Sequence, residues 1–249
     1  MVAAAVSTIW YVDAPDPGAV LRAARADRKT AHALVGRLHP GMSSEPLDRV
    51  PLAQAAAGDP GRVYVGSFPG VTVVCSPDLA ATRPSQLPES WRRTVASENT
   101  YLVVSDPTGA RGAVGAWRRG MLRRAFDATP VDIAEDDGLP FVWERPFWGG
   151  EFPIRWPLDV LPDPQALPFH PRRFAEAANS AWLGFRYTGR AGGELDPHEI
   201  EVWGFEVYRE GERPPTARDE PARPPARRWW WPRRTSARGR ALSGHPHAE

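Results

Sequence analysis

The predicted fold is organised around residues 62–76, which are rich in β-branched and aromatic residues. Two such runs flank Ser67-Phe68-Pro69-Gly70, where proline has no amide donor and glycine tolerates left-handed dihedral angles. The pattern therefore predicts two strands joined by a sharp turn. In the second run, Val71, Val73 and Val74 leave few polar positions, which is typical of a central strand that is buried on both faces.

Further strands are predicted on either side of this pair. Residues 6–12 are rich in β-formers, residues 99–128 read as three strands joined by short turns, and residues 201–208 alternate as a last strand does. Short turns make neighbouring strands antiparallel. Residues 39–60 have little periodicity and are predicted to be mostly loop. In residues 129–171, dense prolines predict a long ordered loop that its aromatic residues hold against the sheet.

Helical spacing of apolar residues occurs in two segments. In residues 17–38, Asp16 and Asp27 stand where N-terminal caps would, which predicts one long helix or two short ones. In residues 171–183 the apolar residues share one face, and Gly184 follows as a C-terminal cap. The chain is therefore predicted to form an α+β domain with two main helices and a mixed or antiparallel sheet of about six or seven strands.

Composition indicates how far the folded domain extends and which cellular compartment suits the protein. The 249 residues are 42% hydrophobic, which is enough for one core, predicted here in residues 1–208. The net charge of +1 hides an uneven split, because residues 209–249 hold ten arginines against five acidic residues, which leaves residues 1–208 at about −4. The single cysteine excludes an internal disulfide and fits a reducing cytoplasm. The apolar run 2–12 lacks a basic n-region and is too short to span a membrane, so it is predicted to be a strand.

Several unusual motifs occur together in an order that resembles an uncharacterised family of actinobacterial proteins carrying a domain of unknown function. The resemblance extends over roughly residues 5–208 and does not include the basic C-terminal segment. It implies a single globular domain, and it brings no catalytic residue, cofactor or partner. The motifs that carry it are Tyr64-Val65-Gly66-Ser67-Phe68-Pro69-Gly70-Val71, Cys75-Ser76, Arg83-Pro84-Ser85-Gln86-Leu87-Pro88, Pro146-Phe147-Trp148-Gly149-Gly150-Glu151, Pro168-Phe169-His170-Pro171 and Leu183-Gly184-Phe185.

Catalytic candidates are few. Cys75 activated by His170 and oriented by Glu151 would supply Cys-His chemistry, as in a hydrolase or transferase. No nucleophile motif surrounds Cys75, however, and a lone cysteine at the end of an apolar strand is more typical of a small buried hydrophobe. No metal site or cofactor is predicted, because the histidines are scattered and residues 135–138 are interpreted as a solvated acidic turn. The glycines match no phosphate-binding fingerprint.

The aromatic segment offers a better case for function. Phe147, Trp148, Phe169 and His170 have the composition of a groove in which flat apolar walls meet a few polar groups. The alternative is that these aromatic residues simply fill the core. The first hypothesis is therefore a cytoplasmic, non-enzymatic binding or interaction protein with a small ligand in this groove, and the enzyme using Cys75 or His170 is the second.

A third hypothesis concerns the segment from Arg209 to Glu249. It is rich in arginine and proline and poor in aliphatic residues, so it is predicted to be disordered. Cations flank three consecutive indoles, a pattern that suits weak contact with anionic membranes or with single-stranded nucleic acid. The residues concerned are Arg227, Arg228, Trp229, Trp230, Trp231, Arg233 and Arg234.

Overall fold

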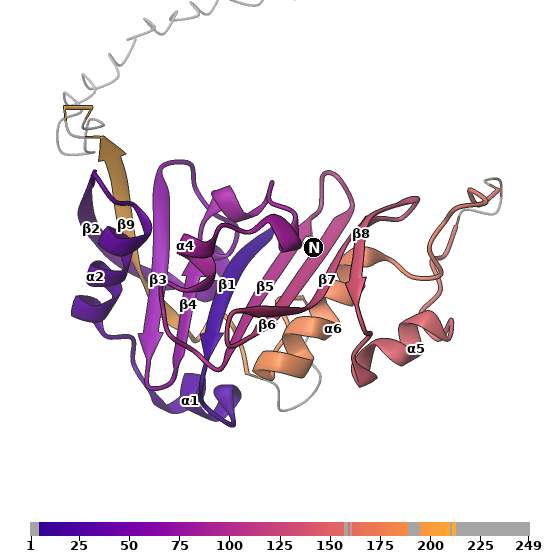
Figure 1. The fold of residues 1–249 in the computed structure, drawn as a ribbon, viewed down its shortest axis with the longest axis horizontal. Coiled ribbons are helices and arrows are strands. Elements are labelled where there is room, and N and C mark those ends of the chain that lie inside the picture. The colour runs from indigo at the N-terminus through magenta and orange to yellow at the C-terminus, as the bar shows by residue number, and fades with distance from the viewer. Residues whose placement is uncertain (1–4, 157–158, 160, 189–194, 210, 213–249) are drawn as a thin grey trace, which may run out of the picture. The chain divides into compact units, whose positions relative to one another are not determined.

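The computed structural model describes residues 5–156, 159, 161–188, 195–209 and 211–212, and its centre is one antiparallel sheet (Figure 1). Within the described residues the sheet has nine strands in the order β2-β9-β3-β4-β1-β5-β6-β7-β8. The fold is α+β, as predicted. The strands are β1 (Val6–Val12), β2 (Met42–Pro51), β3 (Arg62–Phe68), β4 (Val71–Cys75), β5 (Asn99–Asp106), β6 (Arg111–Arg118), β7 (Met121–Thr129), β8 (Asp132–Gly138) and β9 (Glu201–Arg209).

The central strands agree with the sequence pattern. The β3–β4 hairpin turns at the predicted Pro69-Gly70, where Gly70 has a φ of 70°, and all five residues of β4 are buried. β1 lies between β4 and β5 and is buried along its whole length. The three strands β5, β6 and β7 pair in succession as the predicted meander.

The predicted strand count was too low, because two edge strands were missed. β2 lies in the segment that was expected to be loop, and among the described strands it pairs only with β9. β8 contains the acidic residues that were interpreted as a turn, and its one partner in the described part of the chain is β7. β8 is largely exposed and β2 is half-buried or exposed throughout, so neither has the buried apolar pattern by which a strand is usually recognised. The segment after β8 is also less irregular than predicted, since it contains short helices.

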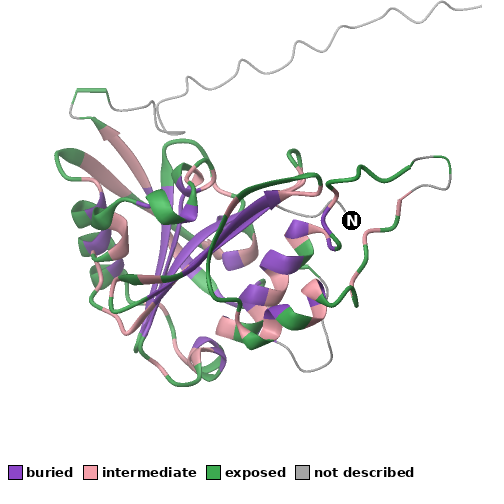
Figure 2. Ribbon diagram, turned by 45° about the vertical axis from the view of Figure 1, so that its right-hand side comes forward, coloured by how far each residue is buried: buried purple, intermediate pink, exposed green. Residues whose placement is uncertain are grey.

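Helices cover both faces of the sheet. Residues of β1 alternate between them: Ile9 packs in the same cluster as Leu34 of α2, whereas Trp10 packs in the cluster that holds Leu183 of α6. Figure 2 shows buried residues concentrated in the central strands and on the sheet-facing sides of these helices. The helices are α1 (Pro17–Ala23), α2 (Arg28–Leu38), α3 (Leu52–Ala55), α4 (Glu89–Arg92), α5 (Arg145–Trp148) and α6 (Pro171–Leu183).

The predicted caps are present. The side chain of Asp16 accepts a hydrogen bond from the amide of Ala19, and Asp27 accepts one from the amide of Thr30. Residues 17–38 therefore form two helices, because the second cap starts a new one. None of the helices in the described part of the chain is both long enough and apolar enough to cross a membrane.

Candidate ligand-binding site

The candidate site lies on the outer side of α6, and its position is set by a close approach of this helix to the sheet. The N-terminus of α6 rests directly on β6 at Gly112, where a Cβ atom would lie 2.1 Å from the carbonyl oxygen of Pro171. The apolar face of the helix packs on β5, β6 and β7 through Phe174 and Ala178. The polar face of α6 is thereby turned away from the sheet.

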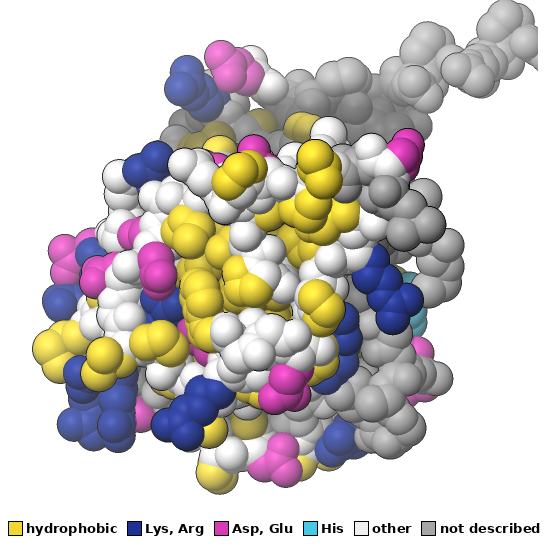
Figure 3. Space-filling view, turned by 90° about the vertical axis from the view of Figure 1, so that its right-hand side faces the viewer, with side chains coloured by type: hydrophobic (Ala, Val, Ile, Leu, Met, Phe, Trp, Pro, Cys, Tyr) yellow, Lys and Arg dark blue, Asp and Glu magenta, His cyan; other side chains and the backbone are white. Residues whose placement is uncertain are grey.

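Three aromatic residues, here called the aromatic wall, lie opposite this polar face: Trp143, Phe147 and Phe152. Residues 143–152, which include α5, fold back so that Phe147 packs against Phe152 and Phe169, with ring centroids 4.6 and 5.4 Å away. Trp143 packs against Phe174 at 4.9 Å. Figure 3 faces the end of the molecule that carries β8 and α5, and apolar side chains gather in the middle of that face with charged ones toward its rim.

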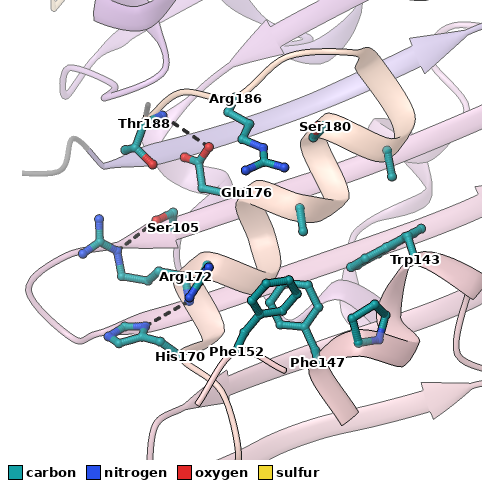
Figure 4. Close-up of a pocket in the computed structure, with 14 residues that line it drawn as sticks. Ser105, Trp143, Phe147, Phe152, His170, Arg172, Glu176, Ser180, Arg186 and Thr188 are labelled. Carbon is teal, nitrogen blue, oxygen red and sulfur yellow. Dashed lines mark hydrogen bonds between the residues drawn. The ribbon is translucent and has the colours of Figure 1, made fainter. Parts of the chain in front are cut away.

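Between the wall and the helix is a cavity of about 660 Å³, shown in Figure 4. This volume falls in the range of small-molecule sites, roughly 300–1,000 Å³. The described residues that line it come from β5, the aromatic wall, α6 with its N-cap residue, and the segment after α6. They are Ser105, Trp143, Pro146, Phe147, Phe152, His170, Arg172, Arg173, Glu176, Ala177, Ser180, Ala181, Arg186 and Thr188.

The arginines on the cavity wall are held in defined positions. Arg172 donates from Nε to the Oγ of Ser105, 3.0 Å away. The guanidinium of Arg173 lies over the ring of Phe152, 4.4 Å from its centroid, in a cation–π contact. His170 caps α6, because its Nδ1 accepts a hydrogen bond from the amide of Arg172 at 3.3 Å. Burial, and then the charge of Arg172, lower the pKa of His170, so this imidazole is neutral at neutral pH.

Glu176 is the one carboxylate among the described lining residues. Its Oε2 accepts hydrogen bonds from the amides of Tyr187 and Thr188, at 2.8 and 3.3 Å. Burial raises the pKa of Glu176, and the amide hydrogen bonds and the charge of Arg186 oppose this shift. Figure 4 shows Arg186 beside this carboxylate. The cavity therefore has aromatic, cationic and anionic parts in defined places.

Comparison with known proteins identifies the chain by family. A model described as "Family of unknown function (DUF6928)" matches residues 6–205. The chain belongs to this family. The matched residues include the whole sheet to Phe205, α6 and the aromatic wall, and they leave out the basic C-terminal segment. No curated protein and no solved structure matched the chain.

The structure divides the predicted binding residues of this family member between cavity and core. Phe147 and His170 line the cavity. Phe169 is fully buried beneath it, and Trp148 packs on Phe126 and Phe169 and donates from Nε1 to Glu144 at 3.3 Å. The predicted binding residues therefore form one cluster, which lines the cavity on one side and belongs to the core on the other.

The catalytic candidates are not brought together. Cys75 is buried on β4 in the cluster that contains Trp10, and it is not among the residues that line the cavity. Glu151 is exposed and is likewise absent from the lining. Within the described part of the chain, no group of three or more potential ligand residues is arranged to hold a metal ion. The tail residues 227–234 lie outside the described residues, so binding to anionic surfaces stays a prediction.

Four charged residues of this site were not predicted from the sequence. Arg172, Arg173 and Glu176 look like the ordinary solvated face of an amphipathic helix, and Arg186 follows it in a polar segment. The available signal was the spacing of Arg172 and Glu176, which are four residues apart and therefore share one side of the helix. That side of the helix becomes a cavity wall only because residues 143–152 fold back opposite it.

A labelling experiment tests the structural role of Cys75. Burial raises the pKa of its thiol far above the usual value, so the reactive thiolate is scarce at neutral pH. We expect iodoacetamide to modify the native protein very slowly and the urea-unfolded protein rapidly, as followed by mass spectrometry. Rapid modification of the native protein at this site would contradict the assignment.

Proposed function

We propose that this domain is a non-enzymatic small-molecule-binding domain whose ligand occupies the cavity between α6 and the aromatic wall. The single observation that carries the proposal is the cavity itself: about 660 Å³, with apolar rings on one side and charged side chains on the other. Such a combination lets a ligand bury apolar surface while a few polar groups fix its orientation.

The enzyme alternative has less support. A Cys-His mechanism needs the thiol and the imidazole within hydrogen-bonding reach. Cys75 lies in the core and is not among the described lining residues, and the Nδ1 atom of His170 is engaged as the helix cap. Binding without catalysis requires neither group to react. The proposal also assumes a cytoplasmic location, which the single cysteine supports.

Filling the cavity tests the proposal. Ala177 lines the cavity from α6, and a tryptophan in its place would occupy the ligand volume. The neutral fluorophore N-phenyl-1-naphthylamine, which brightens in apolar surroundings, is the probe. We expect saturable binding to the wild type and a loss of about tenfold or more in affinity for Ala177→Trp, because the variant removes the contact surface.

Two further variants make the result specific. Ala33→Trp places the same side chain on an exposed position of α2 and should leave probe affinity unchanged. Ala181→Trp, at an exposed position of the cavity lining, should weaken binding even if Ala177→Trp disturbs folding. Circular dichroism establishes that each variant is folded. Absence of saturable binding to the wild type, or equal affinity in all four proteins, would reject the proposal.

A further inference from the structure

The charge of the cavity differs from that of the domain around it. Its described lining contains three arginines and one carboxylate, whereas residues 1–208 as a whole carry about −4. A positive, partly enclosed surface on an acidic domain raises the local concentration of anions and repels cations. A cavity whose only task was to bind an apolar compound would gain nothing from this excess of arginine.

Two arginines have donor groups available at the same end of the cavity. The hydrogen bond of Arg172 to Ser105 uses Nε, so its terminal amino groups are available for a ligand. Arg173 makes a cation–π contact with Phe152 and, among the described residues, no side-chain hydrogen bond, so its N–H donors are available for a ligand. A guanidinium binds a carboxylate, sulfonate or phosphate oxygen pair through two parallel hydrogen bonds. Both arginines stand in the first turn of α6, where the helix dipole also favours negative charge.

The remaining walls limit what else the ligand carries. Phe147 and Phe152 line the cavity beside Arg173, and apolar aromatic lining suits a flat apolar group more than a sugar or an inorganic ion. Glu176 lies one turn further along α6, and its carboxylate would repel a second anionic group there. One anionic end and one flat apolar body are therefore the features that the cavity accommodates together.

We propose that the ligand is a planar aromatic monoanion, with its acidic group between Arg172 and Arg173 and its ring against Phe147 and Phe152. This inference rests on the proposed binding function and goes beyond it by naming the ligand class. An inorganic anion would leave the aromatic wall uncovered, and a polyanion would place charge against Glu176.

A matched pair of probes tests the charge requirement. The dye 1-anilinonaphthalene-8-sulfonate has the same ring skeleton as N-phenyl-1-naphthylamine and adds one sulfonate. We expect the wild type to bind the anionic dye about tenfold or more tightly than the neutral one, as measured by fluorescence titration, because charge-assisted hydrogen bonds contribute to only one of them. Added salt should weaken the binding of the anionic dye and leave that of the neutral dye nearly unchanged.

Substitutions of charged residues test whether Arg172 and Arg173 cause the preference for the anionic dye. Arg172→Gln/Arg173→Gln should lose about tenfold in affinity for the anionic dye while its affinity for the neutral dye changes little. Arg37→Gln, at an exposed position of α2, removes a like charge outside the cavity and should change neither affinity. Glu176→Gln should bind the anionic dye at least as tightly as the wild type, because a repulsive charge is removed.

The outcomes separate this inference from the proposed function. If the neutral dye binds and Ala177→Trp abolishes its binding, while the anionic dye has no advantage, the site exists and the anionic ligand class is wrong. If the double arginine variant weakens both dyes equally, the arginines act through structure and the inference also fails. If neither dye binds the wild type saturably, the proposed function itself fails.

Discussion

Replacing Glu144 with alanine is expected to destabilise the domain by about 3 to 5 kcal/mol, because it leaves a buried arginine without its main counter-charge. Arg124 and Glu144 are both fully buried, and Nη2 of the arginine lies 3.0 Å from Oε2 of the carboxylate. The same carboxylate accepts hydrogen bonds from the amide of Phe141 at 3.0 Å and from the indole of Trp148. It therefore joins β7 to both ends of the segment formed by residues 141–148, which contains α5.

Urea unfolding followed by circular dichroism measures this loss. Glu89→Ala is the control, because Glu89 forms an ion pair with Arg93 that is largely exposed and should contribute little. Glu144→Gln retains hydrogen-bonding capacity without the charge and should fall between the control and Glu144→Ala. If Glu144→Ala were as stable as the control, Asp136, the other ion-pair partner of Arg124, would be sufficient to compensate the buried charge.

The same substitution should also weaken ligand binding. Glu144 fixes the start of the segment that supplies Trp143, Phe147 and Phe152 to the cavity. If that segment loosens, the aromatic wall no longer faces α6 at a constant distance. We therefore expect lower affinity for both naphthylamine dyes in Glu144→Ala, in contrast to the selective effect of the arginine variants. The two patterns distinguish a supporting residue from one that contacts the ligand.

The centre of the fold could be predicted from the sequence because burial leaves a pattern. β1, β4 and the central part of the meander are buried, so they appear in the sequence as short apolar runs rich in β-branched and aromatic residues, which favour strands. β2 and β8 could not be recognised in this way, since each is held by main-chain pairing to one neighbour and neither has a fully buried residue. Pro46 and Pro51 also make the sequence of β2 look unlike a strand, although an edge strand tolerates proline.

The candidate site was predictable only in its aromatic half. Phe147 and His170 stand out in a segment of unusual composition, and both line the cavity. The charged residues become part of a site only because residues 143–152 and 171–188 lie on opposite sides of the cavity. No local sequence pattern predicts this arrangement, because it is determined by where α6 rests on the sheet and by the buried ion pair that fixes α5. Surface arginines on a helix are otherwise unremarkable in sequence.

The position of α6 leads to the second large effect, which is expected for Gly112→Ala. The added methyl group would lie 2.1 Å from the carbonyl oxygen of Pro171, and also 2.8 Å from the amide nitrogen of Arg172. Both atoms belong to the backbone, so no side-chain rotation relieves the contact and the first turn of α6 must move away from β6. We expect a loss of about 3 kcal/mol in the free energy of unfolding, at the upper end of the usual overpacking range.

Gly36→Ala provides the matched control for Gly112→Ala in the same urea unfolding measurement. Gly36 lies within α2, and a Cβ atom there would meet no other atom within 4 Å. Alanine should therefore stabilise this helix by about 0.5–1 kcal/mol. Because His170, Arg172 and Arg173 stand at the displaced end of α6, Gly112→Ala should also lower affinity for the anionic dye, and Gly36→Ala should not. Equal stability of the two variants would mean that α6 does not rest on β6 at Gly112, and the cavity geometry would have to be reconsidered with it.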